Sequence, residues 1–113
     1  MAFQLVELEA GVTKVVLTGR IDIAGAHEID LPMSVVGGSR RAVVIDLSGV
    51  DFMASMGLRG IVLCAKAVQS KRGKIALLAP QPLVLDVIQT SGIDELVPVY
   101  ATEAEAIAAV TAG

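Results

Sequence analysis

The stretch from Val43 to Lys66 constrains the fold of this chain more than any other feature. It begins with the β-branched run Val43-Val44-Ile45, which is typical of a strand covered on both faces. The polar run Ser48-Gly49-Val50-Asp51 then predicts a turn. Beyond it, apolar residues recur at positions 58, 61, 62, 65 and 68, as on the core-facing stripe of a helix. The unit therefore predicts an α/β fold and places Ser55 at or near the start of a helix.

The rest of the chain extends this pattern in both directions. Strands are predicted at 3–9, 12–18, 42–47, 74–79 and 96–100, the first two forming a hairpin at Gly11. Helices are predicted at 24–36, 55–71 and 83–90, with Pro32 limiting the first and Gly73 stopping the second. Thr102, with Glu105 three residues later, predicts the capping box of a last helix. The order β-β-α-β-α-β-α-β-α predicts one domain over residues 1–113, with a mixed, mostly parallel sheet of about five strands and about four helices.

Composition and charge exclude several classes of protein. Aromatic residues make up only 3% of the chain and its net charge is −3, which argues against nucleic-acid binding. The basic pairs Arg40-Arg41 and Lys71-Arg72 are short and are interpreted as solvated ends of a strand and a helix. The single cysteine, Cys64, excludes an internal disulfide and is expected to pack in the core. No signal peptide or membrane-spanning run is seen, so we expect a cytoplasmic protein without direct membrane insertion.

Signals of enzyme chemistry are weak. The sequence contains no metal-ligand spacing, nucleophile elbow or phosphate-binding loop, so we expect neither an enzyme nor a bound metal or cofactor. His27 is interpreted as a surface histidine. Asp22, Asp46 and Asp51 each follow or end a predicted strand and together could hold Mg²⁺, but ordinary turn residues are the favoured interpretation.

The helix that begins near Ser55 carries the strongest functional signals. Its N-terminus favours a bound anion such as a phosphate, although a serine there is also a common helix cap, typically worth ~1 kcal/mol. On its outward face, Met56, Gly60, Leu63 and Ala67 lie opposite the core stripe. This second stripe either contacts another helix of the same domain or binds a partner, and the sequence favours neither.

Three motifs resemble the STAS domain of bacterial anti-sigma factor antagonists, and the resemblance covers nearly the whole chain. Residues 17–22, Leu-Thr-Gly-Arg-Ile-Asp, are similar to the family motif G-x-[LI]-D. Residues 46–58, Asp-Leu-Ser-Gly-Val-Asp-Phe-Met-Ala-Ser-Met-Gly-Leu, are similar to the more specific D-L-S-x-V-x-[FY]-[MI]-D-S-[ST]-G-L. Residues 99–106 resemble the last strand and helix of the family.

The resemblance implies a partner switch instead of an enzyme. Ser55 matches the serine that a kinase, itself the anti-sigma factor, phosphorylates; the unmodified antagonist binds that kinase, and a phosphatase restores binding. The resemblance places Asp22, Met53, Ala54, Met56, Gly57 and Arg59 near the phosphorylation site. Together with the outward stripe of the helix, the sequence predicts a partner-binding surface on an expected monomer, made of Arg20, Met53, Met56, Arg59, Gly60 and Leu63.

The chain departs from the family pattern at three positions. Ala54 stands where the family has an aspartate that contributes to kinase recognition, Met56 where it has Ser or Thr, and Arg59 where it has Gly. These departures leave two alternatives open. One is an unphosphorylated STAS scaffold of a transporter or lipid-transport system, with Met53, Met56 and Leu63 as permanent contacts. The other is a module that binds a nucleotide or anion at the same helix N-terminus.

Overall fold

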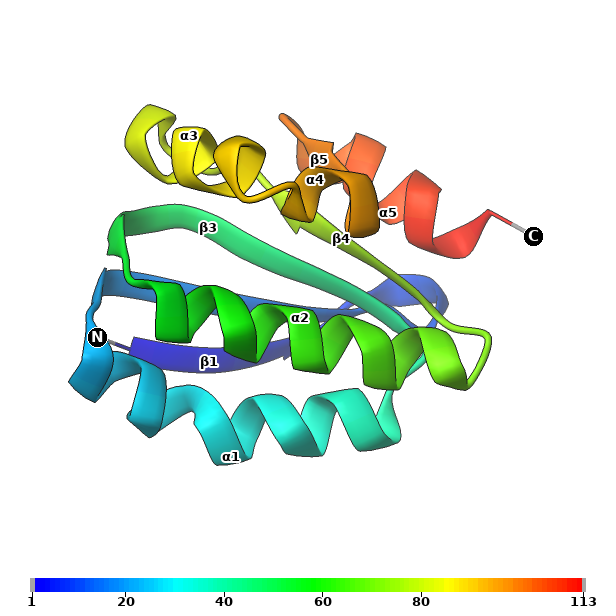
Figure 1. The fold of residues 1–113 in the computed structure, drawn as a ribbon. Helices are drawn as coiled ribbons and strands as arrows, with labels where there is room; N and C mark the ends of the chain where they lie inside the picture. Colours follow the sequence, from blue (N-terminus) through cyan, green and yellow to red (C-terminus); the bar gives the residue numbers. More distant parts are fainter. Residues whose placement is uncertain (1, 113) are drawn as a thin grey trace.

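The computed structural model describes residues 2–112, which form a five-stranded sheet with helices on both faces (Figure 1). The strands are β1 (Ala2–Glu7), β2 (Thr13–Ile21), β3 (Ala42–Met53), β4 (Lys74–Leu78) and β5 (Val99–Tyr100). The helices are α1 (Ile23–Ser39), α2 (Ser55–Ser70), α3 (Pro82–Thr90), α4 (Ile93–Leu96) and α5 (Glu103–Thr111), with a 3₁₀ turn, η1, at Glu9–Gly11.

The sheet has the strand order β1-β2-β3-β4-β5. β1 runs antiparallel to β2, and every other neighbouring pair is parallel. The predicted mixed, mostly parallel five-stranded sheet and the initial hairpin are therefore confirmed. The described chain holds one more α-helix than expected, the single turn α4, because four residues are too few to show a helical period in the sequence.

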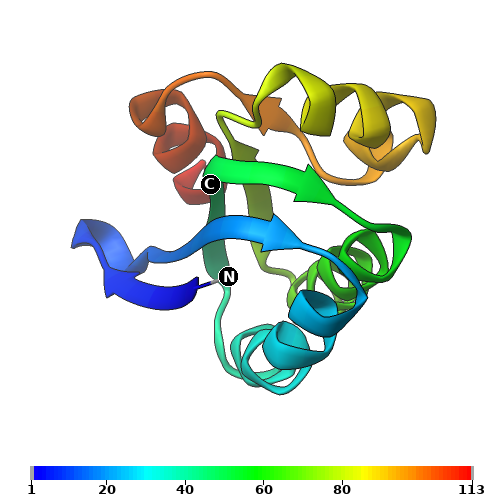
Figure 2. The ribbon, with the colours of Figure 1, turned by 90° about the vertical axis from the view of Figure 1, so that its left-hand side faces the viewer.

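Helices cover the two faces of the sheet unequally. α1 and α2 lie side by side on one face, and α5 lies on the other, as Figure 2 shows. The larger core joins α1 and α2 to inward residues of the central strands, such as Val15, Ile45 and Leu77. The smaller core lies under α5 and includes Val44, Ala76 and Val110.

An ion pair ties α5 to the centre of the sheet. The Nζ of Lys14 on β2 lies 2.5 Å from Oε1 of Glu103 on α5 and 3.8 Å from Oδ2 of Asp46 on β3. The hydrogen bond to Glu103 raises the pKa of Lys14 above its usual 10.5. Asp46 therefore has a partner within the sheet and is not a turn residue.

β3 is twice as long as the predicted strand, which was expected to end at Leu47. The predicted turn at 48–51 lies inside β3 instead, where Gly49 pairs with Thr18 and Phe52 pairs with Arg20 of β2. A Cβ on Gly49 would lie 2.8 Å from Cγ2 of Thr18, so a glycine here allows the two strands to run close together. The polar residues were misleading because this part of β3 is partly exposed.

Other boundaries were also wrong: β1 ends at Glu7 instead of residue 9, and β2 continues to Ile21 instead of ending at residue 18. α1 continues through Pro32 to Ser39, so the expected end at Val36 is corrected. Ile29, Met33 and Val36 are buried before and after the proline, and this packing outweighs the local preference. β5 is confined to Val99–Tyr100 instead of 96–100.

Helix ends were predicted with mixed success. The capping box of α5 is confirmed, because Oγ1 of Thr102 accepts a hydrogen bond from the backbone N–H of Glu105. At the end of α2, Arg72 adopts the left-handed conformation expected of a terminating glycine, with φ of 62°. Gly73 is required for space instead, because its Cβ would lie 2.5 Å from the carbonyl oxygen of Arg41. Within residues 2–112, no helix is both long and apolar enough to cross a membrane.

Candidate functional site

Ser55 is the first residue of α2 and its side chain is exposed. The N-cap is Ala54, with extended backbone at φ −80° and ψ 160°, so the alternative that Ser55 caps the helix is wrong. The carbonyl oxygen of Ala54 accepts hydrogen bonds from the N–H groups of Gly57 and Leu58, at 2.9 and 3.2 Å. The N–H groups of Ser55 and Met56 precede this first bond, and alanine has no side-chain oxygen to receive them. The Ser55 hydroxyl thus lies at an uncapped positive end of the helix dipole.

The ends of β2 and β3 hold this helix start in place. The backbone N–H of Ala54 donates to the carbonyl of Ile21 at 2.8 Å. A Cβ on Gly57 would lie 2.6 Å from Sδ of Met53 and 2.8 Å from Cγ2 of Ile21. Glycine at 57 therefore lets α2 rest directly on the two strand ends. Met53 is only 5% exposed, so it supports the site from below instead of presenting its side chain to a partner.

Arg20, Asp22 and Phe52 form one rim of the site. The guanidinium of Arg20 lies 3.9 Å from the ring centroid of Phe52, and its Nε lies 3.9 Å from Oδ2 of Asp22. Asp22 also caps α1 by accepting a hydrogen bond from the N–H of Gly25 at 2.9 Å. These three side chains line a shallow hollow together with Ala54. Asp22 therefore lies beside the residue that precedes Ser55.

α3 forms the opposite rim. Ser55 and Leu58 share a second shallow hollow with four residues of α3 and the turn after it, Asp86, Val87, Thr90 and Ser91. The carboxylate-bearing Asp86 thus lies on the same hollow as Ser55. The sequence did not predict this rim, because α3 reaches Ser55 only through the tertiary fold. Nor did it predict the role of Phe52, because strand pairing brings Arg20 to Phe52 from a distant part of the sequence.

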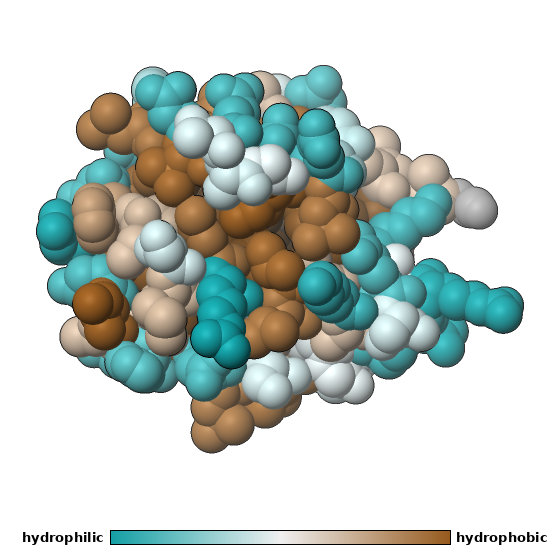
Figure 3. All heavy atoms as spheres, viewed as in Figure 1, coloured by the Kyte–Doolittle hydropathy of each residue, from teal (hydrophilic) through white to brown (hydrophobic). Residues whose placement is uncertain are grey.

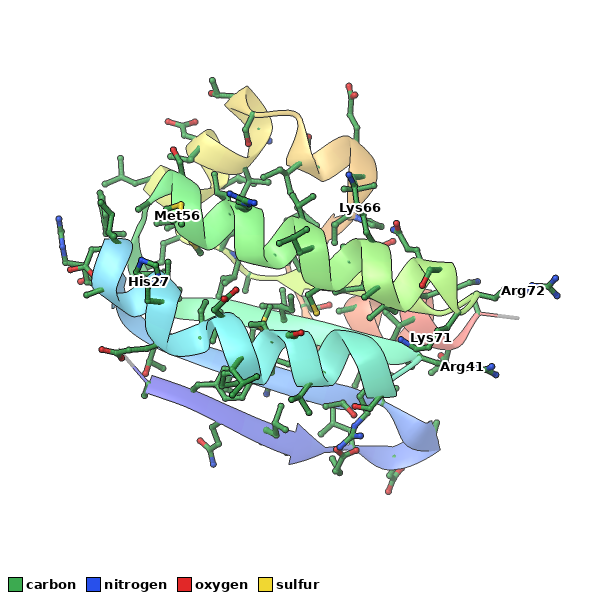
Figure 4. The ribbon with its side chains drawn as sticks, turned by 60° about the horizontal axis from the view of Figure 1, so that its bottom comes forward. His27, Arg41, Met56, Lys66, Lys71 and Arg72 are labelled. Atoms are coloured by element: carbon green, nitrogen blue, oxygen red, sulfur yellow. The ribbon has the colours of Figure 1, made fainter. Side chains whose placement is uncertain are left out.

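The outward stripe of α2 borders a groove against α1. Met56, Arg59, Gly60 and Leu63 line a hollow with His27 and neighbouring residues of α1, and Figure 4 shows His27 and Met56 at the same end of the two helices. A second hollow, which shares Gly60 and Leu63 with the first, continues past Cys64 to Ala67. Met56 and Leu63 are nevertheless 40% and 52% exposed. The sequence left open whether this stripe contacts another helix or is exposed to a partner, and the structure shows both. The small residues of the stripe border α1, and its large residues face solvent.

Exposed apolar side chains surround Ser55 on several elements. Ile23, Phe52, Met56 and Val87 are 63%, 37%, 40% and 39% exposed, respectively. Figure 3 shows apolar surface along the middle of this face, over α2 and towards the layer of α3 and α4. Such a group of exposed apolar side chains is typical of a surface that binds another protein.

The three aspartates considered for a metal do not come together. Asp22 caps α1, Asp46 pairs with Lys14, and Asp51 lies within β3. Residues 2–112 contain no group of three or more metal-ligating side chains. Cys64, the thiol on the groove, is buried, and burial raises its pKa to about 11, as expected for a core thiol.

These features describe a mixed α/β domain with an exposed serine at a helix start and an apolar surface around it. The chain belongs to the STAS domain family, whose model matches residues 5–106. The chain is 34% identical over 94 residues to a Bordetella bronchiseptica protein named as the anti-sigma factor antagonist BtrV, covering 82% of this chain and 80% of that one.

Solved structures show the same relationship. The crystal structure of an anti-sigma factor antagonist from Mycobacterium paratuberculosis is 30% identical and superposes with a TM-score of 0.86, covering 96% of this chain and 92% of that one. The antagonist SpoIIAA is 27% identical; its unphosphorylated form gives a TM-score of 0.78 over 95% of this chain and 94% of its own. The phosphorylated form, from Bacillus, gives a TM-score of 0.73 and covers 94% of this chain and 96% of its own.

Proposed function

We propose that this chain is an anti-sigma factor antagonist that acts by partner switching. It binds an anti-sigma factor that is also a serine kinase, and phosphorylation of Ser55 by that kinase ends the complex. The observation that carries the proposal is the exposed Ser55 hydroxyl at the start of α2, surrounded by exposed apolar side chains. The names of the relatives, and the existence of SpoIIAA in unphosphorylated and phosphorylated forms, support the same function.

Electrostatics explains how one phosphate would act as a switch. A phosphoserine carries roughly −1.5 to −2 charges near neutral pH. At position 55 this charge would have to be desolvated when a partner covers the neighbouring Met56 and Val87, and burying an unpaired charge is costly. The phosphate would also share its hollow with Asp86, whose like charge repels it.

Arg59 gives the phosphate a nearby counter-charge. It lies four residues after Ser55, on the same side of α2, and is exposed. A phosphate on Ser55 would therefore be drawn towards Arg59 and the uncapped N–H groups of the helix, and away from Asp86. In this arrangement phosphorylation masks Arg59 as well as adding charge. The family pattern has glycine at this position, so this contribution is particular to the chain.

In this function the chain is a binding partner and a substrate, and not itself a catalyst. The kinase adds the phosphate, and a separate phosphatase removes it to restore binding. The proposed place of action is the cytoplasm, where both enzymes and the sigma factor would meet the chain as a monomer.

Two variants of Ser55 test the switch. The partner to use is an anti-sigma factor kinase from the same organism, with binding measured by calorimetry. Ser55→Ala should retain its affinity for the partner. Ser55→Asp should bind at least roughly thirtyfold more weakly, which is the loss typical of a substitution at the centre of an interface. Ala108→Glu, which adds a charge at an exposed position of α5, is the control and should bind normally. Equal binding by both Ser55 variants, with no phosphate on Ser55 in cells, would rule out the switch.

Leu63→Glu separates the switch from a permanent scaffold. Leu63 is 52% exposed, so the charge should leave thermal unfolding unchanged while it weakens binding through the α1–α2 groove. If Leu63→Glu abolishes binding but Ser55→Asp does not, the chain is an unphosphorylated STAS scaffold. An unfolded variant would instead place Leu63 in the domain's own core.

A further inference from the structure

The end of the molecule opposite Ser55 collects basic residues from distant parts of the sequence. Arg40-Arg41 precede β3, whereas Lys71-Arg72 follow α2 and Lys74 begins β4. Parallel pairing of β3 with β4 brings them together, and the N–H of Lys74 donates to the carbonyl of Arg41 at 2.7 Å. Five of the nine cationic side chains of a chain with net charge −3 thus gather at one end. Figure 4 shows Arg41, Lys71 and Arg72 there.

Three of these five cationic side chains bind other groups of the same domain. Arg40 lies 3.2 Å from Glu7 and donates to Thr13 at 3.0 Å. The ammonium of Lys71 donates to carbonyls near the C-terminal ends of α1 and α2, and that of Lys74 donates to the carbonyl of Ala112 after α5. Cations in these places stabilise the negative ends of helix dipoles.

Arg41 and Arg72 have no such role. Both are exposed, and within residues 2–112 neither takes part in an ion pair or a side-chain hydrogen bond. In Figure 4 both side chains point away from the body of the protein at the same end. Two guanidinium groups, each able to bind a carboxylate through two N–H groups, are therefore available to a ligand.

The backbone at Arg72 adds a second, independent observation. Its φ of 62° is the left-handed conformation that glycine adopts at low cost after a helix, and that a side chain makes unfavourable. The next residue, Gly73, cannot exchange places with it, because a Cβ there would lie 2.5 Å from the Arg41 oxygen. The chain thus keeps an arginine where its own fold favours glycine. Ala10 and Ala79 also have positive φ, so the backbone at Arg72 supports a use of its side chain outside the fold only together with its exposed guanidinium, which is unpaired within residues 2–112.

We infer that Arg41 and Arg72 form a second docking site, which binds an acidic segment of a partner protein through consecutive carboxylates. Lys71 and Lys74 beside them increase the positive potential. A membrane surface fits less well, because residues 39–42 and 70–74 include no exposed large apolar side chain to insert. A nucleic acid fits less well for two reasons. The five basic side chains can neutralise only a few phosphates, and no aromatic side chain lies among them to stack on a base. The site is remote from Ser55 and does not depend on the proposed switch.

A titration with a defined peptide tests this inference. The probe is a blocked hexapeptide of alternating aspartate and glutamate, added to the isotope-labelled protein at low salt and followed by amide NMR shifts. We expect the shifts to centre on residues 41 and 71–74 and to decrease as salt is added. The Arg41→Gln/Arg72→Gln double variant should bind roughly tenfold more weakly, since two exposed charge pairs are lost.

Two controls keep the result interpretable. Lys66→Glu changes the net charge by the same amount at an exposed position of α2 and should bind the peptide as the parent does. Arg72→Gly should raise the urea midpoint of unfolding while it weakens peptide binding, which separates a binding defect from misfolding. Equal binding by the parent and the Arg41→Gln/Arg72→Gln variant would overturn the inference. So would binding of phosphatidylglycerol vesicles or a single-stranded oligonucleotide in preference to the peptide.

Discussion

Substitution of two glycines about one turn apart in α2 tests how the start of this helix, which carries Ser55, packs on the ends of β2 and β3. Gly57 and Gly60 both lie in the first half of α2, where replacing glycine by alanine normally stabilises a helix by about 0.5–1 kcal/mol. A Cβ on Gly60 would meet no atom within 4 Å, so Gly60→Ala should show that gain. A Cβ on Gly57 would lie 2.6 Å from Met53 Sδ and 2.8 Å from Ile21 Cγ2.

The contact with Ile21 decides the sign for Gly57→Ala. Ile21 is fully buried and its Cγ2 is attached to the carbon next to the backbone, so it cannot turn aside as the thioether of Met53 can. Overpacking of this kind costs about 1–3 kcal/mol. Because the helix-propensity gain is the same in both variants, it cancels between them. We therefore expect Gly57→Ala to unfold with about 1–3 kcal/mol less stability than Gly60→Ala.

Urea unfolding followed by circular dichroism measures this difference directly. The slopes of the two transitions should agree, so that the midpoints report stability alone. Gly57→Ala should also weaken partner binding, because the methyl group displaces the helix start that carries Ser55. Equal stability of the two variants would show that α2 does not rest on Ile21 and Met53, and would refute this account of the site.

Two further predictions concern the core and the last helix. Because burial raises the pKa of the Cys64 thiol from 9.0 to about 11, the unfolded chain loses this proton first, and stability should fall as pH rises between these values. The fall should be smaller in Cys64→Ala, in which the raised pKa of Lys14 still contributes, and an identical pH profile of the two proteins in urea unfolding would contradict the buried thiol. Thr102→Ala removes the N-cap of α5 and should lower the free energy of unfolding by about 1 kcal/mol, whereas a midpoint matching that of the parent would show that the cap contributes nothing.

Local patterns predicted the elements whose periodicity is complete within a short window. The α2 prediction ended one residue from its observed boundary, and the capping box of α5 was correct. The second half of β3 was missed because its polar residues resemble a turn, and only pairing with β2 makes it a strand. α1 was cut short at Val36, although its packing carries it through Pro32 to Ser39.

The sequence by itself determined the α/β alternation, the motif around Ser55 and the position of that serine at the start of a helix. These are local properties, set by side-chain periodicity and by residues adjacent in the chain. The tertiary structure decided what surrounds the serine: Phe52 under Arg20 on one rim and Asp86 on the other. It also brought Arg41 to Arg72. Strand pairing and helix packing create these neighbours between residues far apart in the chain, and no local pattern records such contacts.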